Sequence, residues 1–256
     1  MTEDIIIRPY KEEDIPELTG IWQDAFGDEK ELISSFYSLL PDMGSGFVAE
    51  KDGKVIGMLH MLDARFEDKR IGYVYAVAVK LEYRRRGIGR ALCDAAAKMP
   101  YDIIATLPAE KDLYAWYEKV LGTKPALYGK HEKLLPGEGK FYYEVDAEEY
   151  GCIRRNLLRG KAHIDFPENY LKFQEEICRT YGGGMFAGIG GLACGYVEDS
   201  MLYVKEALGD VSFLPAVCAS LGANYAVIRR ADPCGEPFIA AQGNFPAECE
   251  WNIALD

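Results

Sequence analysis

The sequence has 256 residues, of which 49% are hydrophobic and 27% are charged, so the chain can bury a substantial core as one large domain or two modest ones. Its 29 basic and 41 acidic residues give a formal charge of −12. This charge disfavours a general attraction to nucleic acid or anionic lipid, so a bound anion must be held by a local site. No apolar run approaches the roughly 18 residues of a transmembrane helix, and the first residues are acidic, which predicts a cytoplasmic protein.

The seven cysteines form no CxxC pair, and only three histidines accompany them. Neither a disulfide framework nor a metal site is therefore predicted. We expect the cysteines to be small buried side chains, with a redox role as the alternative.

The N-terminal residues predict one short strand followed by two helices. The strand covers residues 5–8 and ends at Pro9, which has no N–H for a sheet ladder. Apolar residues then recur at three- and four-residue spacing from Glu12 to Phe26, as on one face of a helix. A second helix is expected to begin at Asp28, a residue type that favours the N-cap position.

A tight turn at Asp52-Gly53 between two apolar runs, 47–50 and 55–62, predicts a β-hairpin. The next strand, residues 71–79, is apolar on both faces and should be central in its sheet. The remaining elements expected in this part are a helix over 88–99, a strand over 103–107 and a helix over 112–121. This order combines antiparallel hairpins with one late βαβ crossover, which predicts an α/β fold but not a regular doubly wound one.

Two glycines and a cluster of basic residues lie between the central strand and the following helix. Gly87 and Gly89 let the backbone approach a ligand closely, and the start of the helix directs N–H groups at the same place. Positive charge is concentrated around them at Lys80, Arg84, Arg85, Arg86 and Arg90. The segment predicts a pyrophosphate site, and the alternative is an ordinary turn with solvated arginines. The segment does not match a dinucleotide-binding fingerprint, because the third glycine of that motif is absent. It does not match a P-loop either, because the Gly-Lys-Ser/Thr end is absent.

Residues 5 to about 134 resemble the GNAT superfamily of acyl-CoA-dependent N-acyltransferases. The family signature, Arg/Gln-x-x-Gly-x-Gly/Ala after the fourth strand, matches Arg84-Arg85-Arg86-Gly87-Ile88-Gly89. The resemblance implies acetyl-CoA as cosubstrate, with its pyrophosphate on the loop amides and its pantetheine arm along the preceding strand, where N–H groups near Val77 would polarise the thioester carbonyl. The cofactor-binding residues implied in this way are Val77, Ala78, Val79, Arg84, Arg85, Arg86, Gly87, Ile88, Gly89 and Arg90.

The helix that ends at Gly122 is rich in aromatic residues and resembles a second marker of the family. The resemblance implies that Tyr117 is the catalytic residue that protonates the leaving thiolate. One extra residue before Gly122 departs from the usual pattern, so Tyr114 remains a competitor for this role. The alternative interpretation is that Tyr117 is a core tyrosine of an amphipathic helix.

The general base is left unassigned. The family often uses a glutamate on the central strand, but Tyr73 and Tyr75 occupy that stretch here. Glu50, His60 and Asp63 on the hairpin are substitutes, although charged residues at strand ends usually face water.

Glycines and a proline in residues 135–140 predict a boundary between a catalytic domain, 1–135, and a smaller domain, 140–256. The second domain is expected to contain a strand over 142–145, a helix around Ile153, a helix over 167–180, strands over 185–190, 192–197 and 201–207, a helix over 213–221, and strands over 225–229 and 249–255. This order repeats that of residues 46–107 without the Arg-x-x-Gly-x-Gly segment. It predicts a degenerate second GNAT-like half, with an unrelated α+β domain as the alternative.

The fold class expected is α/β, with a GNAT-like mixed, mostly antiparallel sheet flanked by helices. The function expected is an N-acetyltransferase in which a primary amine of a small molecule or peptide attacks acetyl-CoA directly, because Cys93 lies inside a helix. The acidic chain favours a cationic acceptor and disfavours nucleic acid and membrane as partners. No metal is expected from the cysteine and histidine pattern, and a homodimer remains an open alternative. The alternative is a non-catalytic acyl-CoA sensor, suggested by the absence of a carboxylate near Tyr73.

Overall fold

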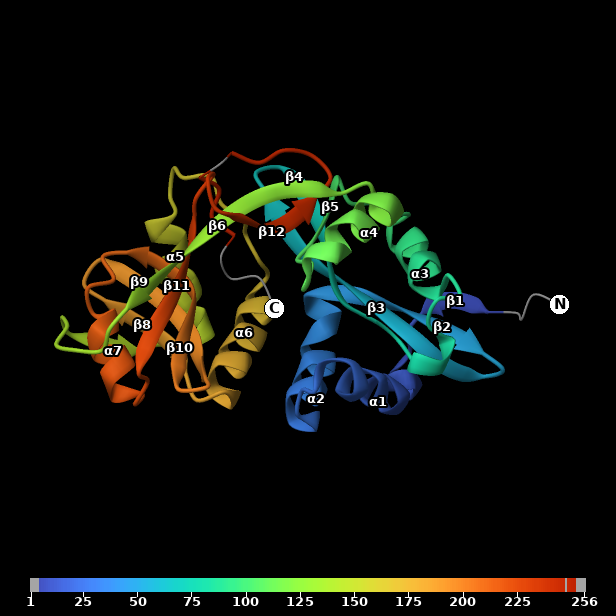
Figure 1. Ribbon diagram of the computed structural model, residues 1–256, viewed down its shortest axis with the longest axis horizontal. Coiled ribbons are helices and arrows are strands. Elements are labelled where there is room, and N and C mark those ends of the chain that lie inside the picture. The colour runs from blue at the N-terminus through green and yellow to red at the C-terminus, as the bar shows by residue number, and fades with distance from the viewer. Residues whose placement is uncertain (1–4, 247, 252–256) are drawn as a thin grey trace. The chain divides into compact units, whose positions relative to one another are not determined.

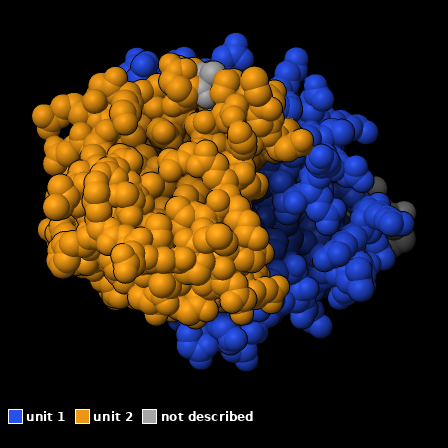
Figure 2. Space-filling model, turned by 60° about the vertical axis from the view of Figure 1, so that its left-hand side comes forward, with its two compact units in different colours: residues 1–126, 239–244 blue, residues 127–238, 245–256 orange. Residues whose placement is uncertain are grey.

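The computed structural model describes residues 5–246 and 248–251 (Figure 1). The chain divides into two compact units, of which the first comprises residues 1–126 and 239–244 and the second residues 127–238 and 245–256 (Figure 2). Residues 127–134 therefore group with the second unit, and residues 239–244 return to the first. Within the described ranges, no helix is long and apolar enough to cross a membrane.

The first unit is built on one mixed sheet. Its strands and helices in chain order are β1 (Ile6–Pro9), α1 (Ile15–Phe26), α2 (Lys30–Leu39), β2 (Gly44–Lys51), β3 (Lys54–Phe66), β4 (Lys69–Val79), α3 (Ile88–Ala96), β5 (Ile103–Thr106) and α4 (Lys111–Leu121). The sheet order is β1-β2-β3-β4-β5, and β12 (Glu236–Ala241) follows β5. Only β4 and β5 run parallel, and the other neighbours are antiparallel. The mostly antiparallel α/β fold is confirmed.

The hairpin predicted at Asp52-Gly53 is confirmed. Both residues have positive φ, +50° and +75°, and join β2 to β3. Two consecutive left-handed residues match the right-handed twist of the flanking strands, which is why this dipeptide favours the turn.

The predicted N-cap at Asp28 is wrong. Glu29 is the residue before α2, and no side chain caps the helix. The Asp28 carboxylate instead accepts a hydrogen bond of 2.7 Å from Trp22 Nε1, because a buried indole N–H needs an acceptor.

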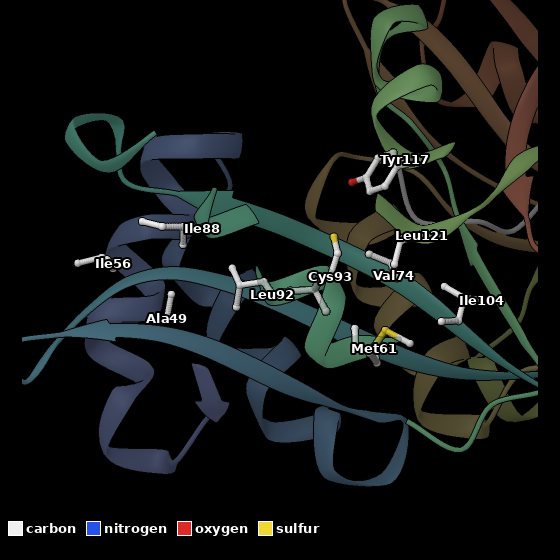
Figure 3. Close-up of a cluster of buried hydrophobic side chains, with 12 residues drawn as sticks. Ala49, Ile56, Met61, Val74, Ile88, Leu92, Cys93, Ile104, Tyr117 and Leu121 are labelled. Atoms are coloured by element: carbon white, nitrogen blue, oxygen red, sulfur yellow. The ribbon is translucent and has the colours of Figure 1, made fainter. Parts of the chain in front are cut away.

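The two faces of this sheet are covered by different helices, with α1 and α2 on one face and α3 and α4 on the other (Figure 1). The α3 and α4 face buries a cluster of aliphatic side chains around Leu92 and Leu121 (Figure 3). The α1 and α2 face is aromatic. There Trp22 packs against Phe36 and Tyr75 at ring-centroid distances of 4.8 and 5.6 Å.

The second unit repeats this element order. Its members are β6 (Lys124–Leu134), β7 (Tyr142–Glu144), α5 (Ala147–Leu157), α6 (Glu168–Thr180), β8 (Gly184–Gly188), β9 (Gly191–Glu198), β10 (Met201–Gly209), α7 (Leu214–Ser220) and β11 (Tyr225–Ala231). The strand order is β6-β11-β10-β9-β8-β7. The order shared with the first unit begins at β7. Two helices follow β7, the antiparallel strands β8, β9 and β10 follow the helices, and α7 leads to β11, which runs parallel to β10.

Two strands, β6 and β12, were not predicted. Each pairs with a strand of the unit that does not immediately precede it in the sequence. Strand β6 follows α4 of the first unit and pairs with β11 of the second. Strand β12 follows β11 and pairs with β5, so that Ala240 lies opposite Thr106. Of the edge strand expected over 249–255, residues 252–255 lie outside the described residues. Residues 249–251 contribute one bridge, between Glu250 and His163.

All seven cysteines are free thiols. Cys152 and Cys234 are exposed, contrary to the expectation of burial, and the other five are buried.

Candidate active site

Strand β4 contains a β-bulge where the family resemblance implied the thioester site. Ala78 lies opposite Met58 and Tyr75 opposite His60, so β4 has one residue more than β3 between these pairs. Ala76 takes up the extra length with a φ of +48°, which is an uncommon conformation for a residue with a side chain. Bulges of this kind re-aim a strand and are frequent beside active sites.

Strands β4 and β5 diverge at the same place. Their parallel register extends from Ile71 to Val74 on β4 and ends at Thr106 on β5. The Thr106 hydroxyl donates a hydrogen bond of 3.2 Å to the Val74 carbonyl and so holds the last paired residues together. Beyond this point Val77, Ala78 and Val79 continue past the end of β5. A ligand with amide groups can pair with backbone of this kind as an added strand does.

The predicted phosphate loop lies between β4 and α3 and is exposed. Arg85 and Gly87 have positive φ, +63° and +82°, and Gly87 is the N-cap residue of α3. No side chain caps the helix, so the N–H groups of its first turn, from Ile88 onwards, remain directed at the loop. Left-handed residues in such a turn gather successive N–H groups around a concavity that suits an anion.

The arginines of the loop occupy different environments. Arg84 Nε donates a hydrogen bond of 2.9 Å to the Val79 carbonyl and so fastens the loop to the end of β4. The guanidinium of Arg86 lies 5.5 Å from the Tyr83 ring centroid. Arg90 Nε is 3.9 Å from an Asp94 carboxylate oxygen in an exposed pair. All four arginines, including Arg85, are exposed, so they add positive charge to the loop without being buried.

The motif suggests that Gly89 faces a ligand, but in the structure Gly89 faces a side chain of α4. A Cβ atom at Gly89 would lie 3.4 and 3.7 Å from two atoms of the Trp116 ring on α4, which is ordinary van der Waals contact. The side chain of a larger residue would therefore meet Trp116, and Gly89 brings α3 close to α4.

Tyr117 lies on α4, buried against the aliphatic cluster, with its ring above Cys93 and Val74 in Figure 3. Burial and the nearby Cys93 thiol raise the pKa of Tyr117 to about 12, although a side-chain hydrogen bond with Thr106 lowers it. The phenol therefore stays protonated at neutral pH and adjoins the residue at which β5 ends. Tyr114, one turn earlier, is half-buried.

The three residues considered as general bases are engaged elsewhere or buried. A Glu50 carboxylate oxygen accepts a hydrogen bond of 2.7 Å from Arg8 Nε, and Asp63 accepts one of 2.7 Å from Tyr101. His60 is fully buried, and burial lowers its pKa to about 3. Its Nε2 lies 3.2 Å from the Tyr37 hydroxyl.

Sequence reasoning missed Thr106 and the aromatic side chains of α1 and α2 that surround Tyr75. Thr106 could have been noted as a polar residue at the end of a buried strand. The aromatic group has a weaker signal, because its members were expected only as the apolar stripes of two helices.

Residues 7–122 match the model of the Acetyltransferase (GNAT) family. The chain contains a GNAT acetyltransferase domain. The match of residues 7–122 to this domain implies acyl transfer from acyl-CoA. No curated protein matches the sequence.

Several solved structures share the fold of the whole chain. A GCN5-related N-acetyltransferase from Kribbella flavida is 15% identical, with a TM-score of 0.65 over 94% of this chain and 71% of its own. One from Anabaena variabilis is 13% identical, with a TM-score of 0.65 over 93% and 72%. A tandem GNAT protein from the clavulanic acid biosynthesis pathway is 12% identical, with a TM-score of 0.57 over 93% and 98%. These similarities show that the fold of the chain, including both of its units, resembles that of these proteins.

The second GNAT-like unit has no counterpart of the basic loop. Between β10 and α7 it carries Asp210, whose carboxylate accepts a hydrogen bond of 2.6 Å from Lys140 Nζ. The segment around Gly137 covers the start of α7, since Gly137 N donates to the Pro215 carbonyl and Gly139 abuts Ala216. Residues of the same chain therefore pack against the first turn of α7.

Proposed function

We propose that the GNAT domain transfers an acetyl group from acetyl-CoA to a primary amine of a small molecule or peptide. The observation that carries this proposal is the combination of the divergence of β4 from β5 with the uncapped start of α3 beside it. The loop amides from Arg85 to Arg90 suit the pyrophosphate. The backbone of Val77, Ala78 and Val79 suits the amide groups of the pantetheine arm.

Direct attack by the amine is favoured over a covalent enzyme intermediate. The Cys93 thiol, which lies in the same buried cluster as Tyr117, is fully buried, and burial raises its pKa to about 12. Such a thiol supplies almost no thiolate at neutral pH. In the proposed reaction the neutral amine nitrogen forms a bond to the acetyl carbon, the carbon–sulfur bond breaks, and Tyr117 donates its proton to the departing sulfur. The nitrogen releases one proton to solvent as the amide forms, and solvent returns a proton to the Tyr117 phenolate. Backbone N–H groups at the bulge near Val77 would stabilise the negative charge that develops on the carbonyl oxygen.

The formal charge of −12 supports a cationic acceptor, such as a polyamine, an aminoglycoside or a lysine-containing peptide. A net negative potential raises the local concentration of cations and the rate at which they arrive. The amine must also be deprotonated before it attacks.

A second candidate function is a non-catalytic acyl-CoA sensor. It is favoured by the state of the three groups considered as bases, since Glu50 and Asp63 bind Arg8 and Tyr101, and His60 is fully buried. Such a protein would bind acyl-CoA on the same loop and release no thiol.

The two functions are separated by isothermal titration with acetyl-CoA, followed by a thiol-release assay over a panel of amines. Gly87→Val is the informative variant, because a β-branched residue is strained at a φ of +82° and reshapes the loop. The matched control is Gly53→Val, at a φ of +75° in the β2–β3 turn. We expect Gly87→Val to lose binding and Gly53→Val to keep it. Binding without turnover of any amine favours the sensor, and no binding by the wild type rejects both functions.

A further inference from the structure

Strand β7 is the last strand in the sheet order of the second unit. It pairs with β8, so that Glu144 lies opposite Phe186, and no other strand within residues 5–246 and 248–251 lies beside its outer edge. Just beyond the strand, Val145 N donates a hydrogen bond of 3.0 Å to the Met185 carbonyl. Residues of an antiparallel strand alternate between bonding to the neighbouring strand and pointing away from it. The N–H and C=O groups of Glu144 and Tyr142 therefore point away from β8, toward the outer edge.

Large apolar side chains are exposed beside this edge. The exposed fractions are 72% for Phe141, 43% for Tyr143 and 79% for Ile189. The ring centroids of Phe141 and Tyr143 are 6.2 Å apart. Tyr142 points to the other face of the sheet, where its ring packs against Phe186. An exposed apolar group at the edge of a sheet favours contact with another protein surface.

Strand β1, at the other end of the strand order, differs from β7 in this respect. It ends at Pro9, and Arg8 Nε forms an ion pair of 2.7 Å with Glu50 on the neighbouring strand. Proline and charged side chains are common devices that discourage pairing at an edge. Residues 141–145, Phe-Tyr-Tyr-Glu-Val, contain no proline and one charged residue. The edge at β7 is thus suited to pairing with another strand.

The sequence around β7 is complementary to itself in the antiparallel orientation. If two copies pair about a two-fold axis at Tyr142, each residue before Tyr142 lies opposite the residue equally far after it in the other copy. Lys140 then faces Glu144, and Phe141 faces Tyr143. Opposite charges and aromatic rings in such positions stabilise antiparallel strands. The two Tyr142 residues can also exchange both of their outward backbone hydrogen bonds.

The residues at the ends of this segment are compatible with the pairing. Lys140 Nζ lies 2.6 Å from an Asp210 carboxylate oxygen in an exposed pair. Because an ammonium group has three N–H donors, Lys140 can bind a second carboxylate as well. Helix α5 begins at Ala147, with Asp146 as its N-cap residue. The paired segment is therefore short and consists of residues 140–144.

We propose that two copies of the chain form a homodimer by pairing their β7 strands in the antiparallel orientation, with Tyr142 at the two-fold axis. Such an interface uses the same surface of both copies, so the assembly closes at two chains. The proposal does not depend on the acyl transfer proposed for the first unit.

The test measures the mass of the full chain over a range of concentrations by sedimentation velocity. In a dimer of this kind, Glu144→Lys brings two positive side chains together, and Lys140→Glu brings two negative ones together. Phe141→Ser removes an aromatic pair and changes an exposed side chain, so it keeps the test decisive if Lys140→Glu does not fold. Glu176→Lys is the matched control, because Glu176 is an exposed carboxylate on α6 of the same unit.

We expect the wild type and Glu176→Lys to dimerise. The dissociation constants of the other three variants should rise at least about tenfold, because the symmetry of the dimer repeats each lost pair. A mixture of Glu144→Lys with Lys140→Glu should form a dimer with one copy of each, since the mixture brings opposite charges together at both places. Native mass spectrometry identifies this heterodimer.

The proposal is overturned if the wild type stays monomeric at its highest soluble concentration, or if the wild-type dimer is not weakened by any of the three variants. It is also overturned if the mixture of the two charge variants stays monomeric. Assemblies larger than two chains would contradict the closed arrangement.

Discussion

Tyr117 combines burial, a raised pKa and a hydrogen bond with Thr106, which suits a proton donor that must keep its proton until a thiolate leaves. We predict that Tyr117→Phe lowers kcat by about 10²-fold or more, the usual size of a general-acid effect, while affinity for acetyl-CoA changes little. Tyr114→Phe is the matched control and should retain activity. Steady-state kinetics and titration of both variants check this, and an equal loss of kcat in the two would leave Tyr117 without a special role.

His60 makes the stability of the protein depend on pH. Its pKa is about 3 in the folded state and about 6.5 in an unfolded chain. Between these values the unfolded chain binds a proton that the folded protein does not, so stability falls as pH falls. We predict a loss from this residue of about 1.4 kcal/mol per pH unit below pH 6. Urea unfolding at pH 7 and pH 5 should show a smaller loss for His60→Gln than for the wild type, and equal losses would contradict the assignment.

At the scale of elements, β12 completes the sheet of the GNAT domain from a distant part of the chain. Ala240 is buried and lies opposite Thr106, and Gln242 N donates a hydrogen bond of 2.8 Å to the Ile104 carbonyl. We predict that Ala240→Pro destabilises the first unit by roughly 3 kcal/mol, because proline removes a ladder N–H and its ring does not fit an interior strand position. Hydrogen exchange at Ile104 and Ala105 should then accelerate. Unchanged exchange there would show that β12 contributes little.

The elements that could be predicted from the sequence are those whose determinants are local. The turn at Asp52-Gly53 needs only two residues with positive φ, and the loop at Gly87 needs only glycine, arginine and a following helix. Strands β6 and β12 could not be predicted in this way. Strand β6 contains Pro125 and many charged residues, and strand β12 is short and contains Pro237. Both strands depend on partners that are far away in the sequence, such as Thr106 opposite Ala240.

The candidate site was only partly accessible to the same reasoning. The resemblance identified the loop and Tyr117, which the structure places at either end of the divergence of β4 from β5. The bulge at Ala76 has no sequence signal, because alanine rarely adopts positive φ and is held there by its neighbours in the sheet. The environments of Glu50, His60 and Asp63 depend on long-range partners in the same way.

At the scale of the whole molecule, the two units share an element order but differ at the place where a phosphate would bind. The first has an exposed basic loop, and the second has Asp210 and the covering segment around Gly137. We predict that each chain binds one molecule of acetyl-CoA. Isothermal titration checks the stoichiometry, and two equivalents per chain would show that the second unit also accepts the nucleotide.

The pairing of β12 with β5 also affects how the protein folds during its synthesis. Strand β5 is synthesised by residue 106, but its antiparallel neighbour is complete only at residue 241. At a translation rate of roughly 5–20 residues per second, this edge of the GNAT domain stays uncovered on the ribosome for on the order of ten seconds. An open sheet edge invites pairing with other chains. The nascent protein therefore passes through a period in which its N-terminal domain is vulnerable to aggregation, and that period ends only when nearly all of the second unit has emerged.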